Sequence, residues 1–328
     1  MNMMKQAKVY RFAILGAGGI GCYYGARLLM AGNKVSFVAR GEHLAALKHD
    51  GLDLQHSDFS FKGAVDACSL EELLEHEPAD FDALLVCVKA TATQELASNI
   101  RQWFEHTGQE TAIISLQNGV DNEPKLAEIL GGDVVIGGLA VRIGGHIIRP
   151  GVVESTGIAQ IVLGAWPGAG SPADRRFGSD LTYWVEAFNR AGIPTRKVSD
   201  IRHEIWRKLV INNGVNPLSA LTRLDTRSLS HHPLLGNIVH QLMQEAARAA
   251  AADGELLTDQ DAQEMFDLIR DFDPIKTSML VDLEKGRQLE VDAISGAVLQ
   301  RSRKLGITAP HTERVHTLLK TQLGEVRR

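Results

Sequence analysis

Three glycines near the start of the chain have the spacing of a phosphate-binding turn. Gly16, Gly18 and Gly21 lie in ILGAGGIGCYYGARLL, after an apolar run and at the opening of a helical pattern. In such a turn the first glycine permits a tight bend, the second lets the backbone approach a pyrophosphate, and the third lets helix and strand pack closely. The free N–H groups of the helix N-terminus attract the phosphates. We therefore predict a dinucleotide site, and not a purely structural turn, with contacts from Gly16, Ala17, Gly18, Gly19, Ile20 and Gly21.

The residue after the second predicted strand indicates which dinucleotide is bound. Strand 35–39 is followed by Arg40, at the place where an Asp or Glu would hold a ribose 2′-hydroxyl. An acid there would repel a 2′-phosphate, whereas a guanidinium can bind one through paired hydrogen bonds. The alternative is an ordinary arginine that faces solvent. We predict that the cofactor is NADPH/NADP+.

One helical segment carries its polar side chains in an unusual stripe. In EIWRKLVINNGVNPLSAL, residues 204–221, Lys208, Asn212 and Asn216 are four residues apart and so share one face. Asparagine is a poor helix former, because its side chain competes for nearby backbone groups. The two asparagines therefore have a local cost that a function on this face would explain. Taken alone, Lys208 could equally be a surface lysine that packs over Trp206.

Two more polar residues follow predicted strands. Lys89 comes after LLVCV, and Asn118, followed by Gly119, comes after IISLQ. Open α/β sheets bind ligands at the carboxyl ends of their strands. We expect Lys89 and Asn118 to lie beside the nicotinamide, although a lysine in such a loop is often simply solvated.

The elements that position these residues differ between the two halves of the chain. Up to about residue 198, strand-length apolar runs alternate with helical patterns, which is typical of a doubly wound α/β domain, here residues 1–198. Antiparallel strands within 133–164 are expected to extend the sheet. The predicted strands are 12–16, 35–40, 83–89 and 112–118, and the predicted helices are 19–31, 69–76, 92–105 and 121–130.

Beyond residue 200 helical patterns follow one another, and we predict an all-α domain over residues 199–328. Thr258 with Asp261 resembles a capping box, and Asp273 followed by Pro274 predicts a helix start. Helix ends are predicted at Gly254, Gly286 and Gly306. The predicted helices are 202–222, 233–252, 259–271, 274–285, 290–305 and 311–322.

The composition argues against several classes of protein. A chain of 328 residues with a net charge of −5 is not expected to bind nucleic acid or a membrane surface. Three cysteines are too few for a disulfide framework, and no apolar run reaches the roughly 18 residues of a membrane span. Without a signal peptide, the chain is expected to be soluble and cytoplasmic. The spacing of its histidines, such as His311 and His316, predicts no metal site.

Together the motifs resemble those of one family. The chain contains, in this order, GAGGIG, VCVKA, LQNGV, EIWRKLVINNGVNPLSAL, TSML and LEVDAISG. Their order and spacing are similar to those of ketopantoate reductases (2-dehydropantoate 2-reductases). The resemblance implies a Rossmann-type NADPH domain, an all-α C-terminal domain like that of 6-phosphogluconate dehydrogenases, and a substrate cleft between them. It also implies reduction of 2-dehydropantoate to pantoate in pantothenate and coenzyme A synthesis, and it is compatible with a homodimer.

The resemblance also assigns roles to residues of the stripe. Lys208 matches the family's general acid, which stabilises the charge that builds on the ketone oxygen and delivers a proton. Asn212 and Asn216 match substrate-binding amides, which can donate to a carboxylate and accept from a hydroxyl. Ser278 matches a serine that contacts the substrate.

Three further residues take roles by the same resemblance. Glu290 matches an acid that hydrogen-bonds in the site and helps to orient the lysine and the cofactor. The alternative for Glu290 is an acid of a first helical turn, favoured by the helix dipole. Lys89 and Asn118 resemble residues that border both the nicotinamide and the substrate.

Two positions depart from the family's pattern. An Asn usually stands three residues before the serine, where this chain has Ile275, and a further substrate-contacting Asn falls near Thr226. Polar contacts to the far end of the substrate are therefore expected to be missing, which changes selectivity and leaves the chemistry at the oxo carbon untouched.

Three other functions stay open. The chain could reduce another branched 2-oxo acid on the same scaffold. It could be a 3-hydroxyacid dehydrogenase, since those enzymes also use Lys-x-x-x-Asn on a helix, but Arg40 and the QNG sequence count against this. A non-catalytic NADP(H)-binding protein would bind the cofactor without turnover, and it would normally tolerate loss of the Lys208–Asn216 stripe.

Overall fold

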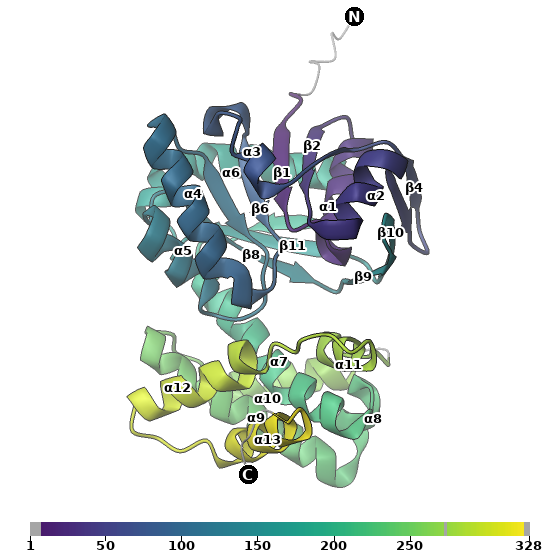
Figure 1. Cartoon of the computed structure of the whole chain (residues 1–328). Helices are drawn as coiled ribbons and strands as arrows, with labels where there is room; N and C mark the ends of the chain where they lie inside the picture. The colour runs from purple at the N-terminus through teal and green to yellow at the C-terminus, as the bar shows by residue number, and fades with distance from the viewer. Residues whose placement is uncertain (1–7, 272–273, 325–328) are drawn as a thin grey trace, which may run out of the picture. The chain divides into compact units, whose positions relative to one another are not determined.

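The computed structural model describes residues 8–271 and 274–324, which form two units by their contacts (Figure 1). One, which we call the α/β unit, comprises residues 1–117 and 122–201. The other, the helical unit, comprises residues 118–121 and 202–328. The domain boundary predicted between residues 198 and 199 stays a prediction.

An eight-stranded sheet forms the centre of the α/β unit, in the order β12-β11-β8-β7-β6-β1-β2-β5. All neighbouring strands are parallel except β8 and β11, which are antiparallel. Strand β1 lies between β2 and β6, and doubly wound sheets bind ligands where the strand order reverses in this way. The strands are β1 (Arg11–Leu15), β2 (Lys34–Val38), β5 (Asp66–Cys68), β6 (Ala83–Val86), β7 (Ala112–Ser115), β8 (Val135–Val141), β11 (Gln160–Ala165) and β12 (Thr195–Lys197).

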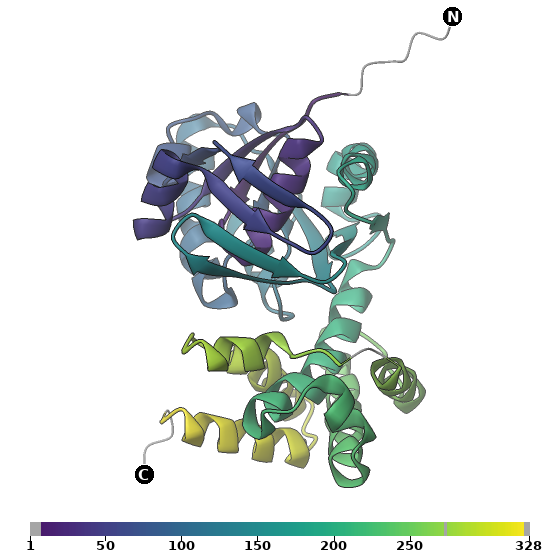
Figure 2. The same cartoon turned by 90° about the vertical axis from the view of Figure 1, so that its right-hand side faces the viewer.

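Helices cover both faces of this sheet, with α1 and α6 on one face and α4 and α5 on the other (Figures 1 and 2). The strands are apolar on both faces for this reason. Phe12 of β1, for example, stacks on Phe188 of α6 with ring centroids 5.6 Å apart. The helices are α1 (Gly19–Met30), α2 (Gly41–Asp50), α3 (Leu70–Leu73), α4 (Thr93–Thr107), α5 (Asn122–Leu130) and α6 (Pro172–Arg190).

A second, four-stranded sheet packs beside α1 and has the order β4-β3-β10-β9 (Figure 2). The prediction that the strands within 133–164 extend the main sheet is right for β8 and β11 and wrong for β9 and β10. These two pair instead with each other and, through β10, with β3. The strands of this second sheet are β3 (Leu52–Gln55), β4 (Ser60–Gly63), β9 (Gly144–Arg149) and β10 (Val152–Thr156).

All regular elements in the described part of the helical unit are helices, so the predicted fold class is confirmed. The capping box of Thr258 and Asp261 is present, and the three predicted helix-end glycines have φ values of +64° to +81°. The α-helices are α7 (Ile201–Thr222), α8 (Thr226–His231), α9 (Pro233–Ala249), α10 (Asp259–Arg270), α11 (Ser278–Glu284), α12 (Ala297–Lys304) and α13 (Pro310–Gln322).

One predicted helix start is wrong. The helix predicted at 274–285 begins at Ser278, because the side chain of Thr277 accepts the N–H of Leu280 and caps it there. Pro274 is not helical, and Asp273 lies outside the described residues. The start predicted at Glu290 is right to within one residue: the helical stretch begins at residue 291 and includes a π-helical turn, η4 (Asp292–Gly296), before α12.

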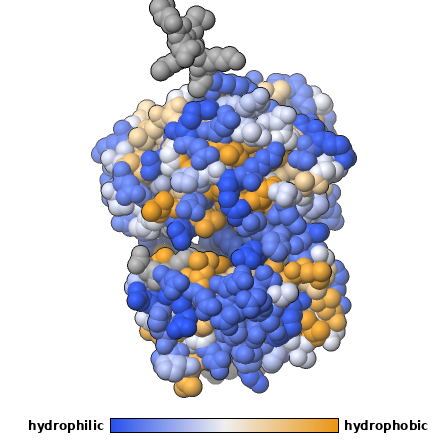
Figure 3. Space-filling view, turned by 180° about the vertical axis from the view of Figure 1, so that it is seen from behind, coloured by the Kyte–Doolittle hydropathy of each residue, from blue (hydrophilic) through white to orange (hydrophobic). Residues whose placement is uncertain are grey.

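Polar residues predominate on the face of the molecule that Figure 3 shows, where apolar residues gather in small groups. Among the described residues, no helix combines the length and the apolar character that a membrane span requires.

Candidate active site

The glycine loop, residues 16–21, turns back toward the end of β2. The amide groups of Gly16 and Ala17 both donate to the carbonyl oxygen of Val38, over 3.2 and 2.8 Å. Gly16 has a φ of +102°, a conformation that favours glycine. A Cβ at Gly21 would lie 2.7 Å from Cγ2 of Ile14 and would also strike the carbonyl oxygen of Gly16. The fold of the turn therefore requires glycine at both positions.

Gly18 differs from these two glycines, because its missing side chain leaves open space. No described heavy atom lies within 4 Å of a Cβ placed on it. Gly18 is the N-cap of α1, and the described first turn of α1 holds no acidic residue. The N–H groups of a first helical turn have no partner inside the helix. Open space, such donors and the positive end of the helix dipole fit a pyrophosphate at residues 18–20.

Arg40 begins α2 at the carboxyl end of β2. It is the N-cap of the helix, with an extended backbone and an exposed side chain. Its position is two residues after Val38, whose carbonyl holds the glycine loop. In doubly wound folds, the residue at the end of this strand contacts the adenosine ribose. A contact between Arg40 and a 2′-phosphate stays a prediction from the sequence.

A buried hydrogen-bond network supports the turn that carries Lys89. Nε2 of Gln117 donates to the carbonyl oxygen of Val88 over 3.0 Å and to Oγ1 of Thr93 over 2.8 Å. Thr93 in turn donates to Oδ1 of Asn122 over 2.9 Å. Because Lys89 follows Val88 directly, this network fixes the backbone from which its exposed side chain extends.

The stripe on α7 differs from a solvated helix face in its burial. Lys208 and Asn212 are half-buried, and Asn216 is only 4% exposed. Within residues 8–271 and 274–324, the amides of Asn212 and Asn216 make no hydrogen bond to another protein group. In this described part of the chain, neither amide has a polar atom that is buried without a partner, so both keep access to solvent and can bond to a small molecule.

The neighbouring Asn213 shows what a structural amide looks like on the same helix. It is fully buried, and its Nδ2 donates to the carbonyl oxygen of Leu242 over 2.9 Å and to Oγ1 of Thr312 over 3.2 Å. Asn213 therefore ties α7 to α9 and α13. Its Oδ1 has no partner among the described residues, so the difference from the stripe lies in the two bonds that Nδ2 makes.

Asn118 and Glu290, far apart in the sequence, lie together in the helical unit. Nδ2 of Asn118 donates to Oε2 of Glu290 over 3.4 Å. Glu290 is the last residue before the helical turn that leads into η4. π-Helical turns occur often at functional sites, because they displace side chains from the regular helical register.

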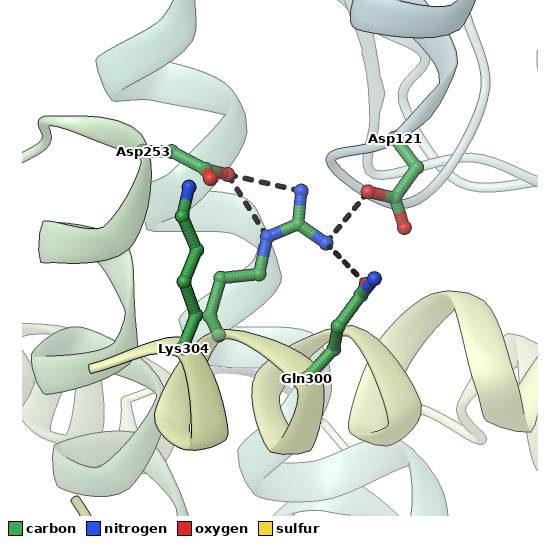
Figure 4. A pocket seen from close by; sticks show the side chains of 5 residues that line it. Asp121, Asp253, Gln300 and Lys304 are labelled. Carbon is green, nitrogen blue, oxygen red and sulfur yellow. Dashed lines mark hydrogen bonds and ion pairs between the residues drawn. The ribbon is translucent and has the colours of Figure 1, made fainter. Parts of the chain in front are cut away.

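An arginine holds the other end of segment 118–121. Arg301 of α12 forms ion pairs with Asp121 over 2.6 Å and with Asp253 over 3.0 Å (Figure 4). Its side chain is only 10% exposed, so these charge-assisted bonds restrain the segment that carries Asn118. The pocket around this arginine is lined by Asp121, Asp253, Gln300, Arg301 and Lys304.

Two family models match most of the chain. Residues 12–168 match the family described as "Ketopantoate reductase PanE/ApbA", and residues 200–322 match "Ketopantoate reductase PanE/ApbA C terminal". The chain belongs to the ketopantoate reductase family. The resemblance that the motifs carry is thereby confirmed.

Similar proteins carry the name of the activity. The chain is 30% identical over 305 residues to a 2-dehydropantoate 2-reductase of Archaeoglobus fulgidus, which covers 92% of this chain and 93% of that protein. It is 31% identical over 327 residues to one of Mesorhizobium japonicum, which covers 94% and 97%. The crystal structure of 2-dehydropantoate 2-reductase from Geobacter metallireducens GS-15 has a TM-score of 0.82 and 30% identity, and covers 95% of this chain and 99% of that one.

As a member of the ketopantoate reductase family, the protein is an oxidoreductase that acts on a small molecule. The family uses NADPH. The open space at Gly18 and the cationic Arg40 fit the two phosphate-bearing parts of that cofactor. Among the described residues, no group of three or more His, Cys, Asp and Glu side chains could hold a metal ion.

The two positions that depart from the ketopantoate reductase pattern are bonded to each other. The amide of Thr226 donates to the carbonyl oxygen of Ile275 over 3.0 Å, and the amide of Ile275 donates to Oγ1 of Thr226 over 3.2 Å. The Thr226 hydroxyl thus already accepts a protein hydrogen bond, and the side chain of Ile275 is exposed. Ser278, at the start of α11, is exposed and has no hydrogen bond to another candidate residue in the described chain.

The residues that support this site have no signal in the sequence. Gln117 and Thr93 read as ordinary residues at the end of a strand and the start of a helix, and Asp121 and Arg301 read as surface charges. Each one acts through a partner distant in the chain, as in the pair Asp121–Arg301.

Proposed function

We propose that the protein reduces 2-dehydropantoate to pantoate with NADPH, that Lys208 is the general acid, and that the reaction serves pantothenate and coenzyme A synthesis. The observation that carries the proposal is the α7 stripe, where a half-buried lysine shares a face with two amides that have no partner among the described residues. Amides in this state suit a ligand that carries both a carboxylate and a hydroxyl.

The proposed chemistry divides between cofactor and protein. NADPH supplies a hydride to the 2-oxo carbon. The ammonium of Lys208 stabilises the negative charge that develops on the ketone oxygen and gives that oxygen its proton. Asn212 and Asn216 hold the carboxylate and hydroxyl of the substrate, and Ser278 adds a further hydroxyl contact.

Other residues position the reacting groups in this proposal. Glu290 accepts from Asn118, which supports a role of the pair in orienting Lys208 and the nicotinamide. Lys89 extends from a rigid turn and contributes positive charge toward the substrate carboxylate. The glycine loop binds the pyrophosphate, and Arg40 binds the 2′-phosphate.

The test is NADPH consumption by the purified full chain with 2-dehydropantoate. We expect Lys208→Ala to lower kcat by about 10²- to 10⁴-fold, the usual contribution of a general acid, with the affinity for NADPH kept. Lys62→Ala is the matched control, because that lysine is 82% exposed and takes no part in the proposed site. Normal turnover by Lys208→Ala would refute the role of Lys208.

A second candidate is reduction of another branched 2-oxo acid on the same scaffold. It is favoured by the mutual bonding of Thr226 and Ile275, which leaves an exposed apolar side chain where the family has an amide. A panel of branched 2-oxo acids with and without a terminal hydroxyl decides between the two. Turnover of the panel without turnover of 2-dehydropantoate would select the second candidate.

A further inference from the structure

One carbonyl inside the glycine loop is held by two side chains. Nε2 of His43 lies 2.9 Å from the carbonyl oxygen of Ala17, and Sγ of Cys22 lies 3.2 Å from the same oxygen. Cys22 is in the first turns of α1 and is fully buried, whereas His43 is in the first turn of α2 and is half-buried. Two neighbouring helices thus converge on one peptide group.

The second ring nitrogen of His43 determines the direction of the bond. Nδ1 lies 3.1 Å from the amide nitrogen of Gly151, in the turn between β9 and β10. A backbone amide can only donate, so Nδ1 is the acceptor and carries no proton. In the neutral ring the proton is then on Nε2, which donates to Ala17. His43 therefore links the glycine loop to the second sheet.

This link sets the orientation of the peptide bond between Ala17 and Gly18. In a planar trans peptide, the carbonyl oxygen and the following N–H point in opposite directions. When His43 and Cys22 hold the oxygen of Ala17 on the protein side, the N–H of Gly18 is directed to the other side. The space at Gly18 is open, since no described atom lies within 4 Å of a Cβ placed there.

Of the first three amides of the glycine loop, only that of Gly18 depends on the hydrogen bond from His43 for its orientation toward a ligand. The amides of Gly16 and Ala17 are already used, since both donate to Val38. A loop with the Ala17 carbonyl turned outward would present an oxygen to the phosphates and would repel them. The hydrogen bond from His43 opposes that rotation.

We propose that His43 is a positioning residue for the cofactor, which holds the Ala17 carbonyl so that the Gly18 N–H points at the pyrophosphate. The inference rests on the proposed NADP(H) site at the glycine loop. It assigns to His43 an effect on cofactor affinity that acts through the Ala17 carbonyl.

The experiment measures NADPH affinity and steady-state kinetics for the full chain and three variants. His43→Ala removes both hydrogen bonds, and His43→Gln keeps an N–H donor that can reach Ala17. His49→Ala is the matched control, because His49 is on the same helix and its side chain is 88% exposed. The second ligand is 2′-AMP, which carries the 2′-phosphate and lacks the pyrophosphate.

For His43→Ala we expect NADPH to bind about tenfold more weakly, as for the loss of one hydrogen bond, with 2′-AMP binding unchanged. KM for NADPH should rise, with kcat at saturating NADPH within about twofold of the wild type. His43→Gln should regain most of the affinity, and His49→Ala should bind as the wild type does.

Equal NADPH affinity in His43→Ala and the wild type would overturn the proposal, as would an equal loss of 2′-AMP affinity, which indicates general loosening of the fold. If His43→Ala does not fold, His43→Leu takes its place, because leucine fills much of the same space and makes neither hydrogen bond; a loss of NADPH affinity that spares 2′-AMP and that His43→Gln does not show supports the positioning role, and unchanged NADPH affinity refutes it. Failure of the proposed function is distinct, because the wild type would then bind NADPH without reducing 2-dehydropantoate.

Discussion

Substitution of the loop glycines separates their two roles, and the distances indicate how. In Gly18→Ala the new methyl group meets no protein atom within 4 Å, and the φ of −81° suits any residue. The free energy of unfolding should therefore change by less than about 1 kcal/mol. In Gly21→Ala the methyl group would lie 2.7 Å from Ile14 and would strike the Gly16 carbonyl. Overpacking of this kind costs about 1–3 kcal/mol or more.

For cofactor binding we expect the reverse: Gly18→Ala, which keeps its stability, should lose affinity for NADPH directly. In the proposed site, the methyl group of Gly18→Ala would occupy the space of the pyrophosphate and would separate a phosphate from an N–H donor. Loss of one charge-assisted hydrogen bond costs about 1.5–3 kcal/mol, so NADPH should bind about 10- to 150-fold more weakly. Any loss of binding in Gly21→Ala should follow the loss of folded protein.

The assay combines thermal unfolding with fluorescence titration of NADPH. Gly132→Ala is the control, because a Cβ there also meets nothing within 4 Å and the residue is outside the loop, between α5 and β8. It should leave both stability and affinity unchanged. A Gly18→Ala protein that melts normally and binds NADPH like the wild type would show that the pyrophosphate is not at this loop.

Three other predictions follow from the charges of single residues. If Arg40 binds the 2′-phosphate as proposed, Arg40→Glu removes a charge-assisted bond and adds a repulsive charge, so KM for NADPH should rise about 100-fold with KM for NADH little changed. A parallel loss of both would contradict the assignment. Glu245→Gln weakens a buried carboxylate that accepts the N–H groups of His311 and Thr312 at the start of α13 over 2.9 and 2.7 Å, so urea unfolding should show a loss of about 1.5–3 kcal/mol with kcat/KM unchanged. Burial lowers the pKa of His43 below its ordinary 6.5, so its contribution to stability is complete above about pH 6.5 and is lost as the pH falls through the lowered value. NADPH affinity should fall in the same pH range, because a proton on Nδ1 of His43 opposes the N–H of Gly151. Burial raises the pKa of the neighbouring Cys22 thiol, so Cys22 stays protonated and does not contribute. His43→Gln should therefore remove this part of the pH dependence.

Much of the fold was predictable from the sequence, because the buried parallel strands are short apolar runs with a clear local pattern. The four predicted strands of the N-terminal half and the long helices α7 and α10 are confirmed with small shifts of their ends. Strands β9 and β10 were assigned to the wrong sheet, since β-branched runs do not specify their partner. β10 pairs with β3, about a hundred residues earlier in the chain, and no local pattern expresses that contact.

The helix start at Pro274 was predicted from a pattern that is valid in general, yet a competing cap prevails. Thr277 caps α11, and the amide of Ile275 is bonded to Thr226, which holds residues 274–277 out of a helix. The π-helical turn before α12 also contains a contact between distant parts of the chain. Ser295 within it bonds to His316 of α13 over 2.8 Å, a contact between helices that the spacing of apolar residues does not show.

Site residues whose position depends on local sequence could be identified, and those that depend on distant contacts could not. Gly16, Gly18 and Gly21 could be identified because the geometry of the loop is made within six residues, so that sequence and backbone shape correspond directly. The stripe on α7 could be identified because helical periodicity alone brings Lys208, Asn212 and Asn216 onto one face. His43 could not, since it acts on a carbonyl 26 residues earlier and takes its own orientation from Gly151, 108 residues later. A residue that positions a binding loop therefore becomes visible only when the packing of α2 between α1 and the β9–β10 turn is known, even though its effect on the bound cofactor should be as large as that of a direct hydrogen bond.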